Sequence, residues 1–288
     1  MKFSVIVALL LLINPLVNLA QTVKEPTEIP AEWSKPYAPF RIAGNLYYVG
    51  TYDLACYLVV TPKGNILINT GLANSSKLIE ASIATLGFKL SDTKILLTTQ
   101  AHYDHMGAMA VLQKKTGARV LVNQHDAQVM KDGGSSDYAL GNGKPTYQPL
   151  TPNGTLKDKE VISLGGTKLT MLSHPGHTKG SCSYSFDVND GKKTYNVLIA
   201  NMPSIVTEKK FSEVTAYPTI EKDYSYTLRA MKALKFDIWL SSHASQFNLH
   251  QKHKPGDRYN PAAFIDPSGY QEVLKDLQAQ YDKKMKEN

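Results

Sequence analysis

The segment 98–107 holds more chemistry than an ordinary turn requires. It contains Gln100, His102, Asp104 and His105 within ten residues. It follows the apolar run 95–97, which predicts a buried strand, and it precedes 108–112, which predicts the start of a helix. In α/β proteins, binding and catalytic groups usually lie at the C-terminal ends of strands, beside helix N-termini. Imidazole and carboxylate are ligands that zinc prefers, so the segment predicts an α/β protein with a metal site at a strand end.

The first 20 residues have the pattern of a secretory signal peptide. The basic residue Lys2 is followed by nine apolar residues at 5–13, and small Ala20 precedes Gln21. We expect cleavage near Ala20. A nine-residue apolar core is too short to cross a bilayer, which argues against a membrane anchor. We therefore expect an exported protein whose residues 21–288 form a single domain, with no membrane attachment after cleavage.

Charge and cysteine content limit the partners and the covalent cross-links. Removal of Lys2 with the signal peptide lowers the formal charge from +7 to +6. The remaining basic residues are scattered among acids and form no stripe with interleaved aromatics, so we expect no binding to nucleic acid. Cys56 and Cys182 could pair in an oxidising compartment, but both lie in apolar, strand-like segments. We favour two buried thiols over a disulfide.

Strand and helix signals divide the mature chain into two similar halves. Pro-rich residues 21–45 predict an extended arm over the surface. Strand signals fall at 46–49, 56–60, 66–68, 95–99, 118–122, 169–172, 197–200 and 238–240. Helix signals fall at 75–86, 108–115, 126–131, 224–234 and 270–281. In each half, these signals predict strands followed by alternating helix and strand, and no linker separates the halves.

Two further histidines repeat the placement of the opening segment. His177 lies in a Gly/Pro-rich turn after the strand signal 169–172, and His243 follows the strand signal 238–240. Both are therefore candidate metal ligands. We interpret His174 as structural or as a partner of a ligand. His125 begins a helix, where a polar residue needs no special role, and we place His250 and His253 in a solvated loop.

These residues resemble the signature of the metallo-β-lactamase superfamily. The family pattern is His-x-His-x-Asp-His, a lone histidine, a metal-bridging group and a final histidine, and it matches 100–105, Gly176-His177-Thr178 and His243. The loop 133–137, the segment 176–181 and Tyr217-Pro218 resemble subclass B3. Gln100 in place of the first histidine, together with the segment 201–204, resembles the glutamine-bearing branch of that subclass, the GOB type. The resemblance runs from about Tyr47 to the C-terminus.

The resemblance implies a fold and two zinc positions. The fold would be a four-layer αββα sandwich of two similar halves, with the site at the edge where the halves meet. One zinc would be held by Gln100, His102 and His177. The other would be held by Asp104, His105 and His243.

Three residues depart from the wider family pattern. Gln100 replaces an imidazole with an amide oxygen, which is a weaker zinc ligand, so the position of Gln100, His102 and His177 could be weak or empty and the protein could work with one ion. Met202 stands where many subclass members have a serine that helps to hold the metal-bound water, and it offers only apolar surface. Asn69 stands where the superfamily often has aspartate, which suggests an adjusted hydrogen-bond pattern near the ligands.

The resemblance implies zinc-dependent hydrolysis of the β-lactam amide of penicillins, cephalosporins and carbapenems, and hence antibiotic resistance. In this reading Asp104 is catalytic as well as a ligand, and Ser204 binds the carboxylate of the substrate. We expect a monomer in the periplasm. Two alternatives stay open. One is another hydrolase of the same fold, acting on a lactone or a thioester, and the other is an exported zinc-binding protein without catalysis.

Overall fold

The strands of the protein form two sheets, seen in a computed structural model that describes residues 23–191 and 193–287. The predicted signal peptide, residues 1–20, lies outside the described residues. Strand order in the larger sheet follows the chain, β1-β2-β3-β4-β5-β6-β7. Its strands are β1 Phe40–Ala43, β2 Leu46–Tyr48, β3 Tyr57–Thr61, β4 Gly64–Ile68, β5 Thr93–Leu97, β6 Arg119–Asn123 and β7 Gly154–Leu156. The smaller sheet has the order β12-β11-β10-β9-β8. Its strands are β8 Val161–Leu164, β9 Thr167–Ser173, β10 Cys182–Asn189, β11 Thr194–Ala200 and β12 Ile238–Ser241.

Both sheets begin with antiparallel pairs and end with parallel ones. In the larger sheet β1 to β4 pair antiparallel, and β4 to β7 pair parallel. In the smaller sheet β8 to β11 pair antiparallel, and β11 pairs parallel with β12. Strands β4, β5 and β6 therefore end at one edge of their sheet. Strands β9, β11 and β12 likewise run in one direction and end at one edge of theirs.

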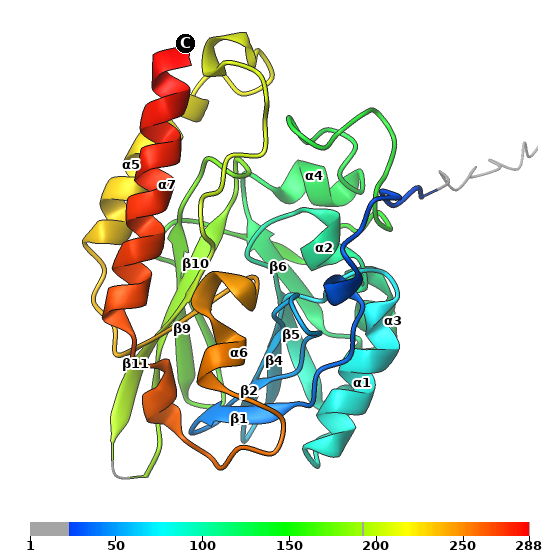
Figure 1. The fold of residues 1–288 in the computed structure, drawn as a ribbon. Coiled ribbons are helices and arrows are strands. Elements are labelled where there is room, and N and C mark those ends of the chain that lie inside the picture. Colours follow the sequence, from blue (N-terminus) through cyan, green and yellow to red (C-terminus); the bar gives the residue numbers. More distant parts are fainter. Residues whose placement is uncertain (1–22, 192, 288) are drawn as a thin grey trace, which may run out of the picture.

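Helices cover the outer face of each sheet, which gives the predicted αββα order of layers (Figure 1). The larger sheet carries α1 Ser75–Thr85, α2 Tyr103–Met106, α3 Met109–Thr116 and α4 Ala127–Lys131. The smaller sheet carries α5 Ile220–Lys232 and α7 Pro267–Glu287, whereas the short helix α6 Leu249–Lys252 lies apart from them, with its His250 against Tyr52 of the first half. On α5, the buried side chains recur at Ile220, Tyr224, Leu228 and Met231, a spacing that puts one apolar stripe on one helix face.

One apolar core lies between the two sheets and joins the halves. It combines side chains such as Tyr57 and Ile68 of the larger sheet with Tyr184 and Trp239 of the smaller sheet. A second core packs α1 and α3 against the outer face of the larger sheet. The central parallel strands are buried on both faces, which explains why β5 and β6 read as nearly continuous apolar runs.

The structure corrects several local expectations. Helix begins earlier than the predicted start at 108–112, because residues 103–106 already form the one-turn helix α2, with His102 as its N-cap residue. The predicted solvated loop around His250 is also wrong. His250 lies in α6, stacks on Tyr52 with ring centroids 3.7 Å apart, and hydrogen-bonds the Tyr52 carbonyl. His253 stacks on Phe40 at 3.6 Å.

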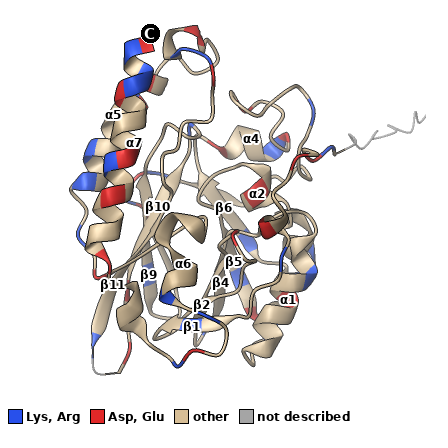
Figure 2. Cartoon of the chain, in the orientation of Figure 1, with Lys and Arg blue, Asp and Glu red and all other residues tan. Residues whose placement is uncertain are grey.

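Surface charge and buried thiols agree with a mixed-charge globular protein. Acidic and basic side chains are interspersed along α5 and α7 (Figure 2).

Cys56 and Cys182 are buried free thiols, as predicted. Burial raises the pKa of the Cys182 thiol to about 12, so this thiol stays protonated at neutral pH. Within the described residues, no helix is long and apolar enough to span a membrane.

Candidate metal centre

The strand ends of the two sheets meet at one edge of the molecule. The Tyr184 hydroxyl donates to the Thr98 carbonyl at 2.8 Å, and the Cys182 amide donates to the Thr99 carbonyl at 2.8 Å. The Tyr57 hydroxyl donates to the Ser241 carbonyl at 2.6 Å. These bonds cross from one sheet to the other. They bring the residues that follow β5, β9 and β12 into one region.

Asp104, His105 and His243 form a compact cluster in this region. One ligand-type atom from each lies within 4.8 Å of the other two. Oδ2 of Asp104 is 3.1 Å from Nε2 of His105 and 3.3 Å from Nε2 of His243. Asp104 and His105 are buried, and Nε2 of His105 has no hydrogen-bond partner. A buried ring nitrogen without a partner, beside a carboxylate and a second imidazole, fits a zinc ion by its donor chemistry.

The carboxylate controls the charge of the cluster. Burial alone would raise the pKa of Asp104, but His105 and His243 hold it well below its usual range, so Asp104 stays ionised. Burial lowers the pKa of His105 and keeps that ring neutral. Burial also opposes the charged form of His243, but Asp104 and Asp53 raise its pKa to about 9. Ionised Asp104 and neutral His105 are therefore in the forms that bind metal, whereas His243 must release a proton when an ion binds.

His102 and His177 lie together beside this cluster. Their ring centroids are 4.9 Å apart. Nδ1 of His177 is 2.8 Å from the Ser204 carbonyl, which leaves Nε2 as the ring atom that could bind a ligand. Nε2 of His102 lies 3.4 Å from Oδ1 of buried Asp137, in the loop that follows α4. The Ser204 carbonyl thus orients the His177 ring through one nitrogen, the usual arrangement for a histidine that binds metal through the other. Nε2 of His102 lies at ion-pair distance from Asp137 but has no hydrogen-bond partner.

Gln100 is tied to the opposite half of the molecule. Its Oε1 accepts a hydrogen bond of 3.2 Å from Nδ2 of Asn201, which follows β11. Oδ1 of Asn201 lies 3.3 Å from the Ser242 hydroxyl, and that hydroxyl lies 2.9 Å from the Thr99 hydroxyl. Asn69 accepts bonds from the Thr99 amide and hydroxyl. A buried polar network therefore connects Gln100 to both halves of the molecule, and Asn69 joins this network through Thr99.

The structure also shows where the other residues singled out in the sequence lie. His174 is buried and its Nδ1 lies 2.7 Å from the Ser183 hydroxyl, outside the cluster. Met202 is buried in the core between the sheets. Oγ of Ser204 lies 3.1 Å from Nδ1 of His177. His125 is exposed beside α4.

Sequence patterns missed two carboxylates that organise the region. Asp126, just after β6, accepts bonds from the Ala101 amide at 2.9 Å, the Gly180 amide at 2.7 Å and the Thr178 hydroxyl at 2.8 Å. It therefore joins the segment of Gln100 to the turn of His177. Asp53, between β2 and β3, bonds Nδ1 of His243 at 3.1 Å. A polar residue where a predicted helix follows a predicted strand was the available signal for Asp126, whereas Asp53 had none.

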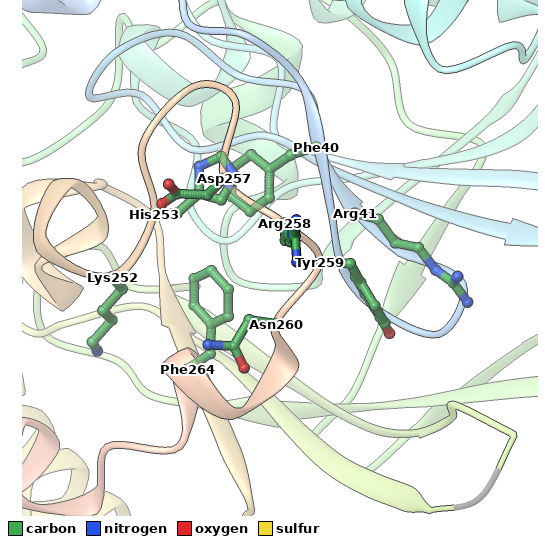
Figure 3. A pocket seen from close by; sticks show the side chains of 9 residues that line it. All are labelled: Phe40, Arg41, Lys252, His253, Asp257, Arg258, Tyr259, Asn260 and Phe264. Atoms are coloured by element: carbon green, nitrogen blue, oxygen red, sulfur yellow. The ribbon is translucent and has the colours of Figure 1, made fainter.

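A well-formed cavity lies elsewhere. About 470 Å³ in volume, it is lined by residues of β1 and of the segment 252–264 (Figure 3). Two of its cations are already paired, because Arg41 lies 3.6 Å from Asp190 and Lys252 lies 2.8 Å from Asp266. The cavity therefore offers little unbalanced charge and holds none of the cluster residues. The candidate functional site is the strand-end cluster, not this cavity.

Comparison with known proteins identifies a family that this chain resembles. A sequence model described as the metallo-beta-lactamase superfamily matches residues 50–191. Among curated proteins, the hydroxyacylglutathione hydrolase of Rhodopseudomonas palustris (strain BisB5) is 31% identical over 131 residues. That match covers 46% of this chain and 42% of the relative, so the chain spans less than half the length of the curated proteins it first matches.

Solved structures match over nearly the whole length. The class B3 di-zinc metallo-beta-lactamase LRA-12, from an Alaskan soil metagenome, is 64% identical with a TM-score of 0.90, covering 91% of this chain and 99% of its own. GOB-18 from Elizabethkingia meningoseptica is 58% identical with a TM-score of 0.92, covering 93% and 100%. A beta-lactamase from Chitinophaga pinensis is 56% identical with a TM-score of 0.88, covering 90% and 97%. With the αββα fold and the strand-end cluster, these matches show that the chain belongs to the metallo-β-lactamase superfamily, and within it to class B3.

Proposed function

We propose that this protein hydrolyses the amide bond of β-lactam antibiotics, including penicillins, cephalosporins and carbapenems, with zinc as its cofactor, and so confers resistance. The observation that carries the proposal is the cluster of buried Asp104 and His105 with partly buried His243 at the edge where the sheets meet. The 58% identity to GOB-18, a metallo-beta-lactamase, supports the substrate class. Among enzymes of this fold, a lactam hydrolase fits these two observations best.

We propose two zinc positions, as the ligand chemistry suggests. Asp104, His105 and His243 would hold one ion. Gln100, His102 and His177 would hold the other, and LRA-12 is described as a di-zinc enzyme. The first position is the stronger candidate, because Oδ2 of Asp104 already lies within 3.3 Å of both imidazoles. The second depends on the amide oxygen of Gln100, which already accepts a bond from Asn201.

Zinc, when bound, supplies Lewis acidity and makes a hydrolytic nucleophile available from water at neutral pH. The residues of the chain do the positioning. The Asp104 carboxylate, kept ionised, holds His105 and His243 toward a common point. We propose that it also orients the attacking water. The Ser204 carbonyl fixes the ring of His177 through Nδ1, so that Nε2 faces the site.

Ser204 is our proposed contact for the carboxylate of the substrate. It lies at the border of the site, half-buried, with Oγ 3.1 Å from Nδ1 of His177. Its carbonyl, not its hydroxyl, provides the shorter contact to His177. The hydroxyl is therefore free to rotate toward an incoming anion while the ring stays in place.

Chelation tests the zinc mechanism. Hydrolysis of a cephalosporin and a carbapenem should be lost when zinc is removed and should return when zinc is added back. His243→Ala should lower kcat/KM by at least about 100-fold, because it removes an oriented ligand and not merely a supporting partner. His250→Ala removes an imidazole on α6 outside the cluster and serves as the matched control. Undiminished hydrolysis by the chelated protein would exclude the zinc mechanism.

A substrate panel separates the alternatives. The curated hydroxyacylglutathione hydrolases, which match part of this chain, make a thioester the most informative competitor. Rates on a lactam, a lactone and a thioester should be highest on the lactam. A thioester rate exceeding the lactam rate would support the other hydrolase. Tight zinc uptake with no turnover of any of the three would support the non-catalytic zinc-binding protein.

We further propose that residues 1–20 direct export, that residues 21–288 form one domain, and that the mature protein acts in the periplasm as a monomer. The core shared by the two sheets supports the single domain. Mass spectrometry of protein recovered from a periplasmic extract tests cleavage near Ala20. Size-exclusion chromatography with light scattering tests the monomer.

A further inference from the structure

Residues 23–36, here called the N-terminal arm, bond to the loop after α4 and to the start of α1, and reach the candidate metal centre at Trp33. The Lys24 amide donates to the Pro145 carbonyl at 2.9 Å, in the long loop after α4. The Ala73 amide, at the start of α1, donates to Glu25 at 3.0 Å. Farther along, Nδ2 of Asn74 donates to the Ser34 hydroxyl at 3.2 Å. The arm passes beside α2 and the head of α1 (Figure 1).

Trp33, in the short 3₁₀ helix Ala31–Trp33, turns from the arm toward the cluster. Its ring lies 5.4 Å from the ring of His243 and 6.2 Å from that of Tyr103, measured between centroids. Its indole Nε1 donates a hydrogen bond of 3.1 Å to Oδ2 of Asp53. Trp33 therefore contacts His243 directly by its ring and indirectly through a carboxylate.

Asp53 connects the arm to His243. The same Oδ2 lies 3.1 Å from Nδ1 of His243, while Oδ1 accepts the Ser245 amide at 2.8 Å. The Asp53 carbonyl accepts the Ala244 amide at 2.7 Å. Three contacts thus hold Asp53 against the segment that carries His243. A carboxylate on Nδ1 fixes the tautomer of a histidine and makes Nε2 the metal-binding atom.

We propose that Trp33 is a positioning residue for zinc, and that the N-terminal arm is part of the metal centre through the chain Trp33–Asp53–His243. The indole N–H holds Oδ2 of Asp53 in line with Nδ1 of His243, and the ring covers the outer side of the His243 imidazole. The inference rests on the proposed function, because it takes Asp104, His105 and His243 to hold zinc. Its consequence is that a change in the arm alters zinc affinity without changing any ligand.

Zinc affinity of the full mature chain, measured by competition with a chromogenic chelator, tests the inference. Trp33→Phe keeps an aromatic ring but removes the N–H, and should weaken zinc binding by roughly 3- to 10-fold, below the 10- to 100-fold typical of a direct partner such as Asp53 in Asp53→Ala. Ser34→Ala removes the arm's bond to Asn74, not the bond to Asp53, and should bind zinc like the wild type. Unfolding midpoints of the zinc-free variants check that each one folds.

A spectroscopic readout separates positioning from general loosening. The visible absorption of the cobalt-substituted protein should shift in Trp33→Phe and stay unchanged in Ser34→Ala. Wild-type affinity and spectrum in Trp33→Phe would overturn the inference while leaving the proposed function intact. Equal weakening in Trp33→Phe and Ser34→Ala would also overturn it, since the arm would then act only as a cover. A wild-type chain that takes up no zinc would defeat the proposed function itself.

Discussion

Gln100 has a side chain that both halves of the molecule share. It follows β5 in the first half, and its amide oxygen accepts a bond from Asn201 in the second. One lone pair of that oxygen is already used, and an amide oxygen is a poorer zinc ligand than an imidazole. These two facts together explain why the second zinc position should be the weaker of the two.

Replacement of Gln100 by histidine tests this weakness. Gln100→His should raise zinc affinity at the second position by about 10-fold or more, because imidazole suits zinc better than an amide does. Equilibrium dialysis should show the second equivalent binding at lower free zinc than in the wild type. Asn201→Ala, which frees the amide oxygen without adding an imidazole, is the comparison variant. An unchanged second equivalent in Gln100→His would show that residue 100 is not a ligand.

His174 should give the protein a specific sensitivity to acid. Burial lowers its pKa to about 4 from an ordinary 6.5. Between these two pH values the unfolded chain holds a proton that the folded chain does not, so stability falls as the pH falls. The lowered pKa corresponds to a decrease of about 3 kcal/mol in the free energy of unfolding by pH 4.

His174→Asn should remove this loss, because Asn keeps a polar atom near the Ser183 hydroxyl but does not titrate. Urea unfolding at several pH values between 4 and 7 measures the effect. The variant should lose less stability than the wild type across this range. Parallel curves for the two proteins would show that His174 does not carry the acid sensitivity.

At the residue scale, the sequence predicted the groups that are dense and local. His102, Asp104 and His105 lie within four positions, after an apolar strand, and can therefore be recognised from the sequence. Asp53 and Trp33 do not, because each acts on a residue roughly 20 to 190 positions away, as the bonds between Trp33 and Asp53 and between Asp53 and His243 show. A single sequence carries no periodicity that links such distant positions.

Helix α2 is the element that presents two of the candidate ligands, and a glycine determines its position. The Gly107 amide donates to the Gly71 carbonyl at 2.9 Å, and the Thr70 amide donates to the His105 carbonyl at 2.9 Å. A Cβ at position 107 would collide with the backbone of Leu72 and Ala73. The helix can lie this close to the segment after β4 only because residue 107 has no side chain.

Gly107→Ala should push α2 away from that segment. We expect a loss of about 1–3 kcal/mol in stability, as for other overpacked sites, together with weaker zinc binding. Gly117→Ala provides the matched control. Gly117 has a φ of 67° with no atom near its missing Cβ, so alanine there should cost stability but not zinc affinity. Denaturant unfolding and zinc titration of both variants separate the two effects.

The prediction of helices and strands succeeded where the spacing of apolar residues was regular. It failed where tertiary contacts determined the local structure. The stripe of α5 and the apolar run of β5 were readable, although α5 begins earlier than the spacing indicated, at Ile220. The one-turn helix α2 was missed, because four residues give no helical period. The placement of His250 in α6 was missed as well, since its stacking on Tyr52 depends on a residue 198 positions away.

On the scale of the whole molecule, the candidate site is built from both halves. Asp104 and His105 belong to the first half and His243 to the second. The repeated strand and helix pattern predicted two similar halves, and the resemblance placed the site where they meet. The bonds that fix this edge, such as Tyr57 to Ser241, depend on how the two sheets pack and could not be read from the pattern.

Zinc should therefore stabilise the molecule as a whole. At a free concentration 100 times the Kd, binding to the folded state alone adds about 2.7 kcal/mol to the free energy of unfolding. Thermal unfolding at increasing zinc should show a rising Tm in the wild type. His243→Ala removes the second half's ligand from the cluster with Asp104 and His105, and should show a smaller rise. A Tm independent of zinc in the wild type would contradict a site that joins the halves.

The bond between Asp53 and His243 also has a consequence for the order of events during folding. These residues are 190 positions apart, so a chain must close a very long loop before they meet. Contacts of this kind are rewarded only after most of the chain has folded. Zinc bound at this site should therefore stabilise the native state but not the transition state for folding. Added zinc should slow unfolding and leave the refolding rate nearly unchanged.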